Sequence, residues 1–210
     1  CSMRALAGDN EHPTKALKPF DLNRDGFIAG EGACSMILED YDQAKGRGAK
    51  IYCEVVGYGS SNDAYDMIAL HETGRGLKRA VNAAIRKAGI DPSQINYINP
   101  HGSATPANDR VETMVFKEVM GAAAYKAAIS SVKPITGHCM GASGSVEALA
   151  CVMAIRDQKV APTINYATPD PECDLDYVPN VARSMPVNFS MSTSVGLGGH
   201  NSAVIFKKAN

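Results

Sequence analysis

Two short stretches of this chain place a histidine in the same local setting. One stretch, residues 99–106, contains His101, and the other, residues 131–138, ends at His138. Each follows a short apolar run with β-branched residues and precedes a helical pattern, so we expect both imidazoles at strand-to-helix turns. Active sites of layered α/β proteins gather at turns of this kind.

The chemistry available to two such histidines is hydrogen-bond donation to a developing oxyanion. A lone histidine in a turn bounded by Gly and Pro is more often structural than catalytic, but two turns of similar context favour a shared site. A neutral imidazole can donate its N–H to an oxygen that becomes negatively charged in a transition state. Lys133, five residues before His138, would fix the orientation and protonation state of that histidine or hold a nearby carboxylate.

Hydropathy patterns predict that strands and helices alternate around these turns. Apolar, partly β-branched runs predict strands at residues 34–38, 51–58, 97–98, 129–132, 190–194 and 202–206. We expect a short helix ending at residues 45–48, an amphipathic helix over residues 76–88, and a helix capped by Asn108 or Asp109 that runs to about Met120. Residues 1–6 are interpreted as the tail of a further helix.

Residues 146–155 form the most apolar segment, and only Glu147 interrupts it. A helix that is apolar all round is buried all round. Together with the alternation of strands and helices, this segment predicts a layered α/β fold in which a central helix is covered on both sides.

Composition and charge exclude several classes of function. The 210 residues are 45% hydrophobic and 20% charged, with a formal net charge of -1, which is ordinary for a soluble protein and not basic enough for a nucleic-acid partner. No apolar run is long enough for a membrane span, and the first residues do not form a signal peptide, so we expect a cytoplasmic protein. Six cysteines without CxxC spacing indicate reduced thiols, with neither disulfides nor a zinc site.

Two motifs imitate ligand sites without completing them. Residues 21–28 have the pattern of an EF-hand calcium loop, but position 12 of that loop is Gly32 instead of glutamate, so we expect no calcium and no other metal. The Gly-Leu-Gly-Gly sequence at residues 196–199 precedes no helical pattern, which argues against a nucleotide loop. Its glycines would instead let backbone N–H groups approach a ligand closely.

Further motifs complete a recognisable set. They are Lys-Pro-Phe-Asp at 18–21, Arg-Asp-Gly-Phe-Ile-Ala-Gly-Glu-Gly at 24–32, Pro-Thr-Ile-Asn at 162–165, Asp-Leu-Asp at 174–176 and Gly-Leu-Gly-Gly-His-Asn at 196–201. With the two histidine stretches, their order and spacing resemble the β-ketoacyl-acyl-carrier-protein synthases, the Cys-His-His condensing enzymes. The resemblance covers nearly all 210 residues, but it is to the C-terminal half of such an enzyme.

This resemblance implies a fold and a missing component. It implies an α/β chain that forms the C-terminal half of a layered, thiolase-like αβαβα fold with a buried central helix. Residues 1–210 would make up the C-terminal domain of a ketosynthase. The nucleophilic cysteine of the family lies upstream of the position of Cys1, so an N-terminal half absent from this chain would supply it.

The resemblance also assigns catalytic roles. His101 and His138 would stabilise the thioester-enolate oxygen and assist decarboxylation of a malonyl group. Lys133 would pair with Glu147 and hold His138 in place. These residues would serve a decarboxylative Claisen condensation of malonyl-acyl-carrier-protein with an acyl thioester, in fatty-acid or polyketide synthesis.

By the same resemblance, four further residues would bind the substrate. Ser103 and Thr105 match hydroxyl positions that contact the phosphopantetheine arm of acyl carrier protein. Leu197 and Gly198 belong to the loop whose backbone N–H, at Leu197, would stabilise the oxyanion of the acyl thioester. No cofactor of the enzyme's own is expected, because the substrate is carried on the phosphopantetheine. Arg4 matches a position near the entrance used by the carrier protein.

The chain departs from the family pattern at the last loop. Val195 and Leu197 stand where the family has phenylalanines, which changes the gate of the acyl pocket. Thr193 replaces the usual asparagine before that loop, and Ser103 replaces a threonine.

Three functions are compatible with these features. The first is the catalytic half of a condensing enzyme, with an N-terminal ketosynthase half and acyl carrier protein as partners and a homo- or heterodimer as the assembly. The second is a non-catalytic partner subunit of the chain-length-factor type. The third is an independent Cys-His enzyme that uses Cys139 beside His138, which the opposite directions of adjacent side chains in an extended stretch disfavour.

Overall fold

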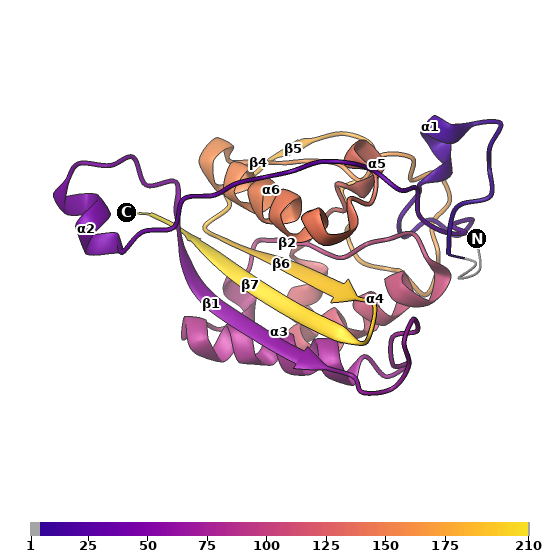
Figure 1. The fold of residues 1–210 in the computed structure, drawn as a ribbon, viewed down its shortest axis with the longest axis horizontal. Coiled ribbons are helices and arrows are strands. Elements are labelled where there is room, and N and C mark those ends of the chain that lie inside the picture. The colour runs from indigo at the N-terminus through magenta and orange to yellow at the C-terminus, as the bar shows by residue number, and fades with distance from the viewer. Residues whose placement is uncertain (1–4, 210) are drawn as a thin grey trace.

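The computed structural model describes residues 5–209 (Figure 1). The helices are α1 Pro13–Ala16, α2 Tyr41–Gly46, α3 Arg75–Ala88, α4 Pro106–Met120, α5 Lys133–Thr136 and α6 Ser143–Asp157, with single 3₁₀ turns at Pro92–Gln94, Gly121–Tyr125 and Met140–Ala142. The strands are β1 Cys53–Asn62, β2 Tyr97–Asn99, β3 Ala128–Ile129, β4 Lys159–Val160, β5 Arg183–Ser184, β6 Phe189–Gly196 and β7 His200–Lys208.

A five-stranded sheet in the order β1-β7-β6-β2-β3 forms the centre of the molecule. The pairs β1/β7 and β6/β7 are antiparallel, whereas β2 runs parallel to both β6 and β3. Five of the six predicted strands correspond to strands of this sheet, and the predicted helices over residues 76–88 and 146–155 correspond to α3 and α6. The predicted α/β class is therefore confirmed.

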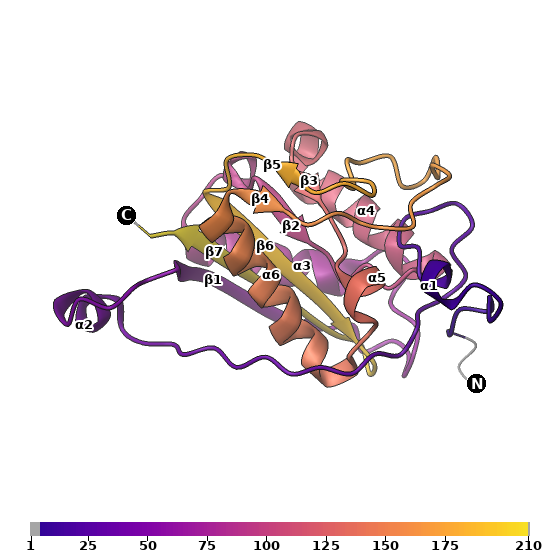
Figure 2. The ribbon, with the colours of Figure 1, turned by 90° about the horizontal axis from the view of Figure 1, so that it is seen from above.

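Helices cover both faces of the sheet, with α3 and α4 on one face and α6 on the other (Figure 2). Successive strand residues point to opposite faces, so each strand contributes to two cores. Ile98 and Ile129 belong to the core under α3 and α4, and their neighbours Tyr97 and Ala128 belong to the core under α6. The strand ends that carry the histidine loops are thus held from both sides.

Two glycines of β1 allow α3 to lie very close to the sheet. A Cβ at Gly57 would stand 2.3 Å from the carbonyl oxygen of Ala84, and a Cβ at Gly59 would stand 1.9 Å from that of Ala80. Both separations are far below van der Waals contact, so a larger residue at either position would force the helix away from the strand.

Helix α6, predicted to be the buried central helix of the complete layered fold, is covered on one side by this chain. Its inward face, which includes Ala148 and Cys151, is buried against the sheet, but Leu149 is 40% exposed and Met153 is 36% exposed. Within residues 5–209 there is thus a layer on only one side of this apolar helix. The apolar outer face is available for a further layer of protein.

Residues 34–38, predicted to form a strand, lie in an extended segment that pairs with no strand among the described residues. Ile37 is 94% exposed and Leu38 is 76% exposed. The segment passes along α6 to the projecting helix α2 (Figure 2). The strand prediction is wrong for this structure because strand formation needs a neighbouring strand for its backbone N–H and C=O groups.

Two smaller predictions also need correction. Helix α4 begins at Pro106 with Thr105 as its N-cap, so Asn108 and Asp109 lie inside the helix and are buried. Proline suits the first helical position, because its ring presets φ and it has no N–H to leave unpaired. Of the predicted helix tail over residues 1–6, residues 1–4, including Arg4, lie outside the described residues, and Leu6 instead bridges Phe27.

The ligand-like motif at residues 21–28 serves to fasten loops. Asp21 accepts the backbone N–H groups of Ala167 and Thr168 at 2.7 and 2.6 Å, and Arg24 pairs with the buried Asp170. In residues 5–209 no set of three His, Cys, Asp or Glu side chains is placed to hold a metal ion. No helix in that part of the chain combines the length and hydropathy that crossing a bilayer requires.

Candidate active site

The loop between β2 and α4 carries His101, and a buried glutamate determines its shape. Glu112, on the second turn of α4, accepts the backbone N–H groups of His101 and Gly102, each at 2.7 Å, one on each carboxylate oxygen. Asn108 and Thr193 donate to the same carboxylate at 2.8 and 3.1 Å. Glu112 therefore holds the histidine loop against the start of α4 and against β6.

Sequence reasoning did not identify Glu112. The signal was an acidic residue between Val111 and Val115, on the predicted helix that follows the first histidine stretch. A carboxylate on a buried helix face requires hydrogen-bond donors, and the nearest candidates are the N–H groups of the preceding loop.

The backbone of His138 is fixed by residues 28–30, which belong to one of the recognised motifs. His138 donates its N–H to the carbonyl of Ile28 at 2.8 Å and accepts the N–H of Gly30 at 3.0 Å. A Cβ at Gly30 would stand 2.4 Å from the carbonyl oxygen of Thr136, so only glycine permits this approach. The ring of Phe27 packs edge-on against the imidazole, with the two ring centroids 4.9 Å apart.

The two imidazoles lie side by side, with ring centroids 5.2 Å apart and planes 75° apart. For His138, the backbone N–H of Met140 lies 3.2 Å from Nδ1. Because an amide N–H can only donate, Nδ1 is the acceptor and Nε2 carries the proton of the neutral ring. His138 is thereby prepared to donate from Nε2.

Lys133 and Glu147 form an ion pair behind the histidines, and both side chains are almost fully buried. The ammonium of Lys133 also donates to the backbone carbonyl of His101. The resemblance implied that Lys133 holds His138, but its hydrogen bonds go to Glu147 and to the loop of His101. The ring of His138 is bonded instead by Met140 and by the hydroxyl of Ser143.

Burial and the nearby ammonium keep both imidazoles neutral. Burial lowers the pKa of His138 to about 4, and the positive charge of Lys133 acts in the same direction. Burial, Lys133 and His138 hold the pKa of His101 well below its ordinary value. Burial also raises the pKa of Glu112 to about 7, although the N–H groups of His101 and Gly102 oppose this shift. At neutral pH the site therefore presents two uncharged histidine donors.

A cavity of about 820 Å³ brings the histidines together with most of the predicted substrate-binding residues. His101, His138, Ser103, Thr105 and Leu197 line its wall. The hydroxyls of Ser103 and Thr105 lie 3.1 Å apart. Lys133 and Glu147 are not among the wall residues, and Lys133 bonds the loop of His101 from behind. Wall residues outside the predicted motifs include Met140 and Ser143, while Phe27 and His200 belong to predicted motifs but had no role assigned.

The glycine-rich turn between β6 and β7 closes one side of this cavity. Gly198, which has φ +79°, donates its N–H to the carbonyl of Met67 at 2.8 Å and accepts the side chain of Asn62 at 2.9 Å. Asp63 donates its backbone N–H to the carbonyl of Gly199 at 2.9 Å. The turn is thus fastened to residues 62–67, while the side chain of Leu197 is 57% exposed at the cavity wall.

Cys139 does not have the geometry of a nucleophile. Its sulfur lies 3.6 Å from the carbonyl oxygen of Thr136 and 3.9 Å from that of Gly137, which would repel a thiolate. Its neighbours His138 and Met140 line the cavity and Cys139 does not. This arrangement argues against the independent Cys-His enzyme.

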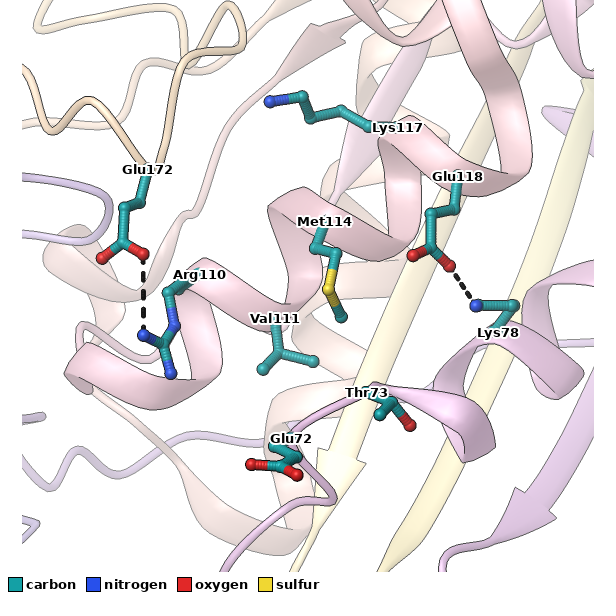
Figure 3. A pocket seen from close by; sticks show the side chains of 9 residues that line it. All are labelled: Glu72, Thr73, Lys78, Arg110, Val111, Met114, Lys117, Glu118 and Glu172. Carbon is teal, nitrogen blue, oxygen red and sulfur yellow. Dashed lines mark ion pairs between the residues drawn. The ribbon is translucent and has the colours of Figure 1, made fainter.

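A second hollow, of about 840 Å³, lies between α3, α4 and the loop that contains Glu172 (Figure 3). Arg110 pairs with Glu172 at 3.6 Å on one side of it, and Lys78 pairs with Glu118 on the other side (Figure 3). These side chains are partly to largely exposed, so the pairs contribute little energy. The hollow contains no histidine and does not share the chemistry of the first cavity.

A sheet covered by helices on both faces, with two neutral histidines at its strand ends, fits the half of a thiolase-like fold that the resemblance implies. Residues 52–167 match the family model "Beta-ketoacyl synthase, C-terminal domain". The chain therefore belongs to the β-ketoacyl synthase family.

Individual proteins agree with this assignment. The chain is 51% identical over 207 residues to 3-oxoacyl-[acyl-carrier-protein] synthase 2 of Synechocystis sp., covering 99% of this chain and 50% of that protein. It is 46% identical over 204 residues to a putative polyketide beta-ketoacyl synthase 1 of Streptomyces cyaneus, covering 97% and 48%. The chain thus spans about half the length of the curated relatives it matches.

A solved structure extends the likeness to three dimensions. It is a type II polyketide ketosynthase, bound to a hexaketide, in complex with its acyl-carrier protein. It superposes on this chain with a TM-score of 0.94 at 41% identity, covering 100% of this chain and 52% of that one.

Proposed function

We propose that this chain is the catalytic C-terminal half of a β-ketoacyl-acyl-carrier-protein synthase. It would act with an N-terminal half that holds an acyl group on a cysteine, in fatty-acid or polyketide synthesis in the cytoplasm. The observation that carries the proposal is the pair of neutral imidazoles, 5.2 Å apart, in one cavity wall. The buried ion pair of Lys133 and Glu147 supports them from behind.

The proposed reaction uses the imidazoles as donors to one oxygen. When the carboxylate of a malonyl thioester leaves as carbon dioxide, its bonding electrons form an enolate whose negative charge rests on the thioester oxygen. N–H groups of His101 and His138 would stabilise that oxygen, as oxyanion holes do. The enolate carbon then attacks the acyl thioester, a carbon–carbon bond forms, and the cysteine thiolate of the N-terminal half leaves.

Neutral histidines suit this role because an uncharged imidazole can donate its N–H without first taking up a proton from solvent. The pKa of His138, lowered to about 4 by burial and by Lys133, keeps the ring uncharged throughout the neutral range. The ion pair with Glu147 places the ammonium of Lys133 behind the developing enolate, where it would add a positive potential.

The acyl groups would arrive on the phosphopantetheine arm of acyl carrier protein, so the chain would need no cofactor of its own. The hydroxyls of Ser103 and Thr105, 3.1 Å apart in the cavity wall, are suitable hydrogen-bonding groups for the amides of that arm. The backbone N–H of Leu197 would stabilise the acyl-thioester oxyanion, with Gly198 giving the turn its conformation. The aliphatic Val195 and Leu197 would leave the acyl gate wider than phenylalanines would.

An N-terminal half would cover the apolar surface that this chain exposes. Ile37 and Leu38 are exposed in an unpaired extended segment, and Leu149 and Met153 are exposed on the outer face of α6. Exposed contiguous apolar surface marks an interface. We propose that residues 34–38 add as a strand to a sheet of the N-terminal half, which also packs on α6, and that the assembly dimerises.

The alternative is a non-catalytic partner of the chain-length-factor type. A subunit that only shapes a pocket needs neither two neutral imidazole donors nor a buried ion pair whose lysine bonds one of the histidine loops. The presence of His101, His138, Lys133 and Glu147 together therefore favours the catalytic half.

The deciding experiment measures malonyl-thioester decarboxylation by the complete enzyme that contains this chain. We expect His101→Ala and His138→Ala each to lower the rate by about 2 to 4 kcal/mol of transition-state free energy, the loss of one oxyanion donor. His12→Ala is the matched control, because its side chain is 68% exposed and is not part of the cavity wall. Wild-type rates in both cavity variants would favour the non-catalytic alternative.

A further inference from the structure

The hydroxyl of Ser143 lies 2.9 Å from Nδ1 of His138. Ser143 is the first residue of α6, is only 7% exposed, and lines the cavity beside the imidazole. The other neighbour of Nδ1 is the backbone N–H of Met140, at 3.2 Å. Nδ1 therefore faces two groups that can donate.

These two groups together favour one tautomer of His138. The amide of Met140 can only donate, so a proton on Nδ1 would oppose it directly. At 3.2 Å that amide alone is a long hydrogen bond, close to the upper limit for N–H donors. A hydroxyl at 2.9 Å that donates to the same lone pair strengthens the preference for a proton on Nε2.

The hydroxyl of Ser143 has no competing structural duty among the described residues. Ala142 occupies the N-cap of α6, and no side chain caps that end of the helix. Two residues further on, Ser145 donates its hydroxyl to the carbonyl of Ala142 at 2.9 Å, as a serine does when it serves the backbone. Ser143 is bonded to the imidazole instead.

We propose that Ser143 is a positioning residue that holds His138 in the Nε2–H tautomer and in the orientation that directs this donor into the cavity. The kinetic consequence rests on the proposed function, whereas the tautomer does not. Among the other charged or titratable groups, His101 packs against the ring, Lys133 places its charge near it and pairs with Glu147, and Asp25 and His200 line the same cavity. Lys133 and the burial of the ring determine its charge, and the hydroxyl of Ser143 acts with the amide of Met140 to determine which nitrogen carries the proton.

The test is nitrogen-15 NMR of the histidine side chains in the complete enzyme at neutral pH. In the wild type we expect the signature of a proton on Nε2 of His138 and an acceptor at Nδ1. Ser143→Ala should give a measurable population with the proton on Nδ1, and Ser143→Thr, which keeps a hydroxyl, should restore the wild-type spectrum. Ser145→Ala is the matched control on the same turn of α6.

Decarboxylation provides the second measurement. We expect Ser143→Ala to lower kcat about three- to tenfold with little change in KM, which corresponds to one neutral hydrogen bond, and Ser143→Thr to recover most of the loss. An Nε2–H signature unchanged in Ser143→Ala would overturn the proposal, whatever the rates. If Ser143→Ala changes the nitrogen-15 spectrum of His138 but the wild-type enzyme does not decarboxylate malonyl thioester, the positioning role of Ser143 stands and the proposed function fails.

Discussion

Glu112→Gln changes a single atom of the group that shapes the histidine loop. Oε1 accepts from His101 N–H and from Thr193, while Oε2 accepts from Gly102 N–H and from Asn108. Whichever way the new amide is turned, its NH₂ group faces one of the two backbone N–H donors. One charge-assisted hydrogen bond is therefore lost, and a buried N–H is left without an acceptor.

The magnitude follows from those two losses. A hydrogen bond to a charged group is worth about 1.5–3 kcal/mol, and an unsatisfied buried donor costs about 1–3 kcal/mol. We expect Glu112→Gln to reduce the local stability of the histidine loop by about 3–5 kcal/mol. Since every 1.4 kcal/mol is tenfold, hydrogen exchange at Gly102 should accelerate by at least about 100-fold.

The assay is amide hydrogen exchange of the complete enzyme, resolved to the peptide that contains Gly102. Glu118→Gln is the matched control on the same helix, because Glu118 is 44% exposed and, within residues 5–209, pairs with Lys78 alone, so its loss should stay within about 0.5 kcal/mol. Equal protection of Gly102 in both variants would refute the claim that Glu112 shapes the loop.

Four further outcomes can be measured. Lys133→Ala leaves the carboxylate of Glu147 buried without its positively charged partner and should destabilise the enzyme by about 3–5 kcal/mol in thermal or urea unfolding; adding Glu147→Gln should recover part of this loss. Because the pKa of His138 is lowered to about 4, its contribution to stability is fully present above about pH 6.5 and is lost as the pH falls through about 4. The acid limb of decarboxylation should therefore lie near pH 4, and a limb near 6.5 would contradict the neutral-donor role. Cys139→Ser should leave condensation nearly intact, and an acyl adduct on Cys139 in peptide mass mapping would revive the independent Cys-His enzyme. Ile37→Asp should weaken association with the N-terminal half at least tenfold in a binding titration, whereas Ser35→Asp, on an already polar neighbour, should not.

The sequence predicted the main elements because their signals are local. Residues 76–88 alternate apolar and charged residues with helical spacing, and residues 202–206 form a β-branched run, so α3 and β7 follow from pattern alone. The two histidine stretches were placed at turns before helices for the same reason. Residues 34–38 have an equally clear strand pattern, but the partner strand does not lie in the described part of the chain, and pairing is not a local property.

The candidate site shows the same division. The resemblance identified His101, His138, Lys133 and Glu147, because fixed motifs in fixed order are visible in the residues themselves. It did not predict the hydrogen bond from Lys133 to the carbonyl of His101, since that carbonyl reaches the ammonium only when the two histidine loops have come together in the fold. Glu112 was not found, because its donors belong to another loop and to β6.

By itself, then, the sequence determined the α/β class, most helices and strands, the two histidines and the membership of the β-ketoacyl synthase family, since each depends on the types and spacing of neighbouring residues. Only the tertiary structure decided which side chains of the site contact each other and which groups they hydrogen-bond. It brought the imidazoles to 5.2 Å, directed Lys133 to the loop of His101 and placed the hydroxyl of Ser143 on Nδ1 of His138. The physical reason is that hydrogen bonds and burial act between elements distant in the chain, and their lengths and angles exist only once those elements have packed.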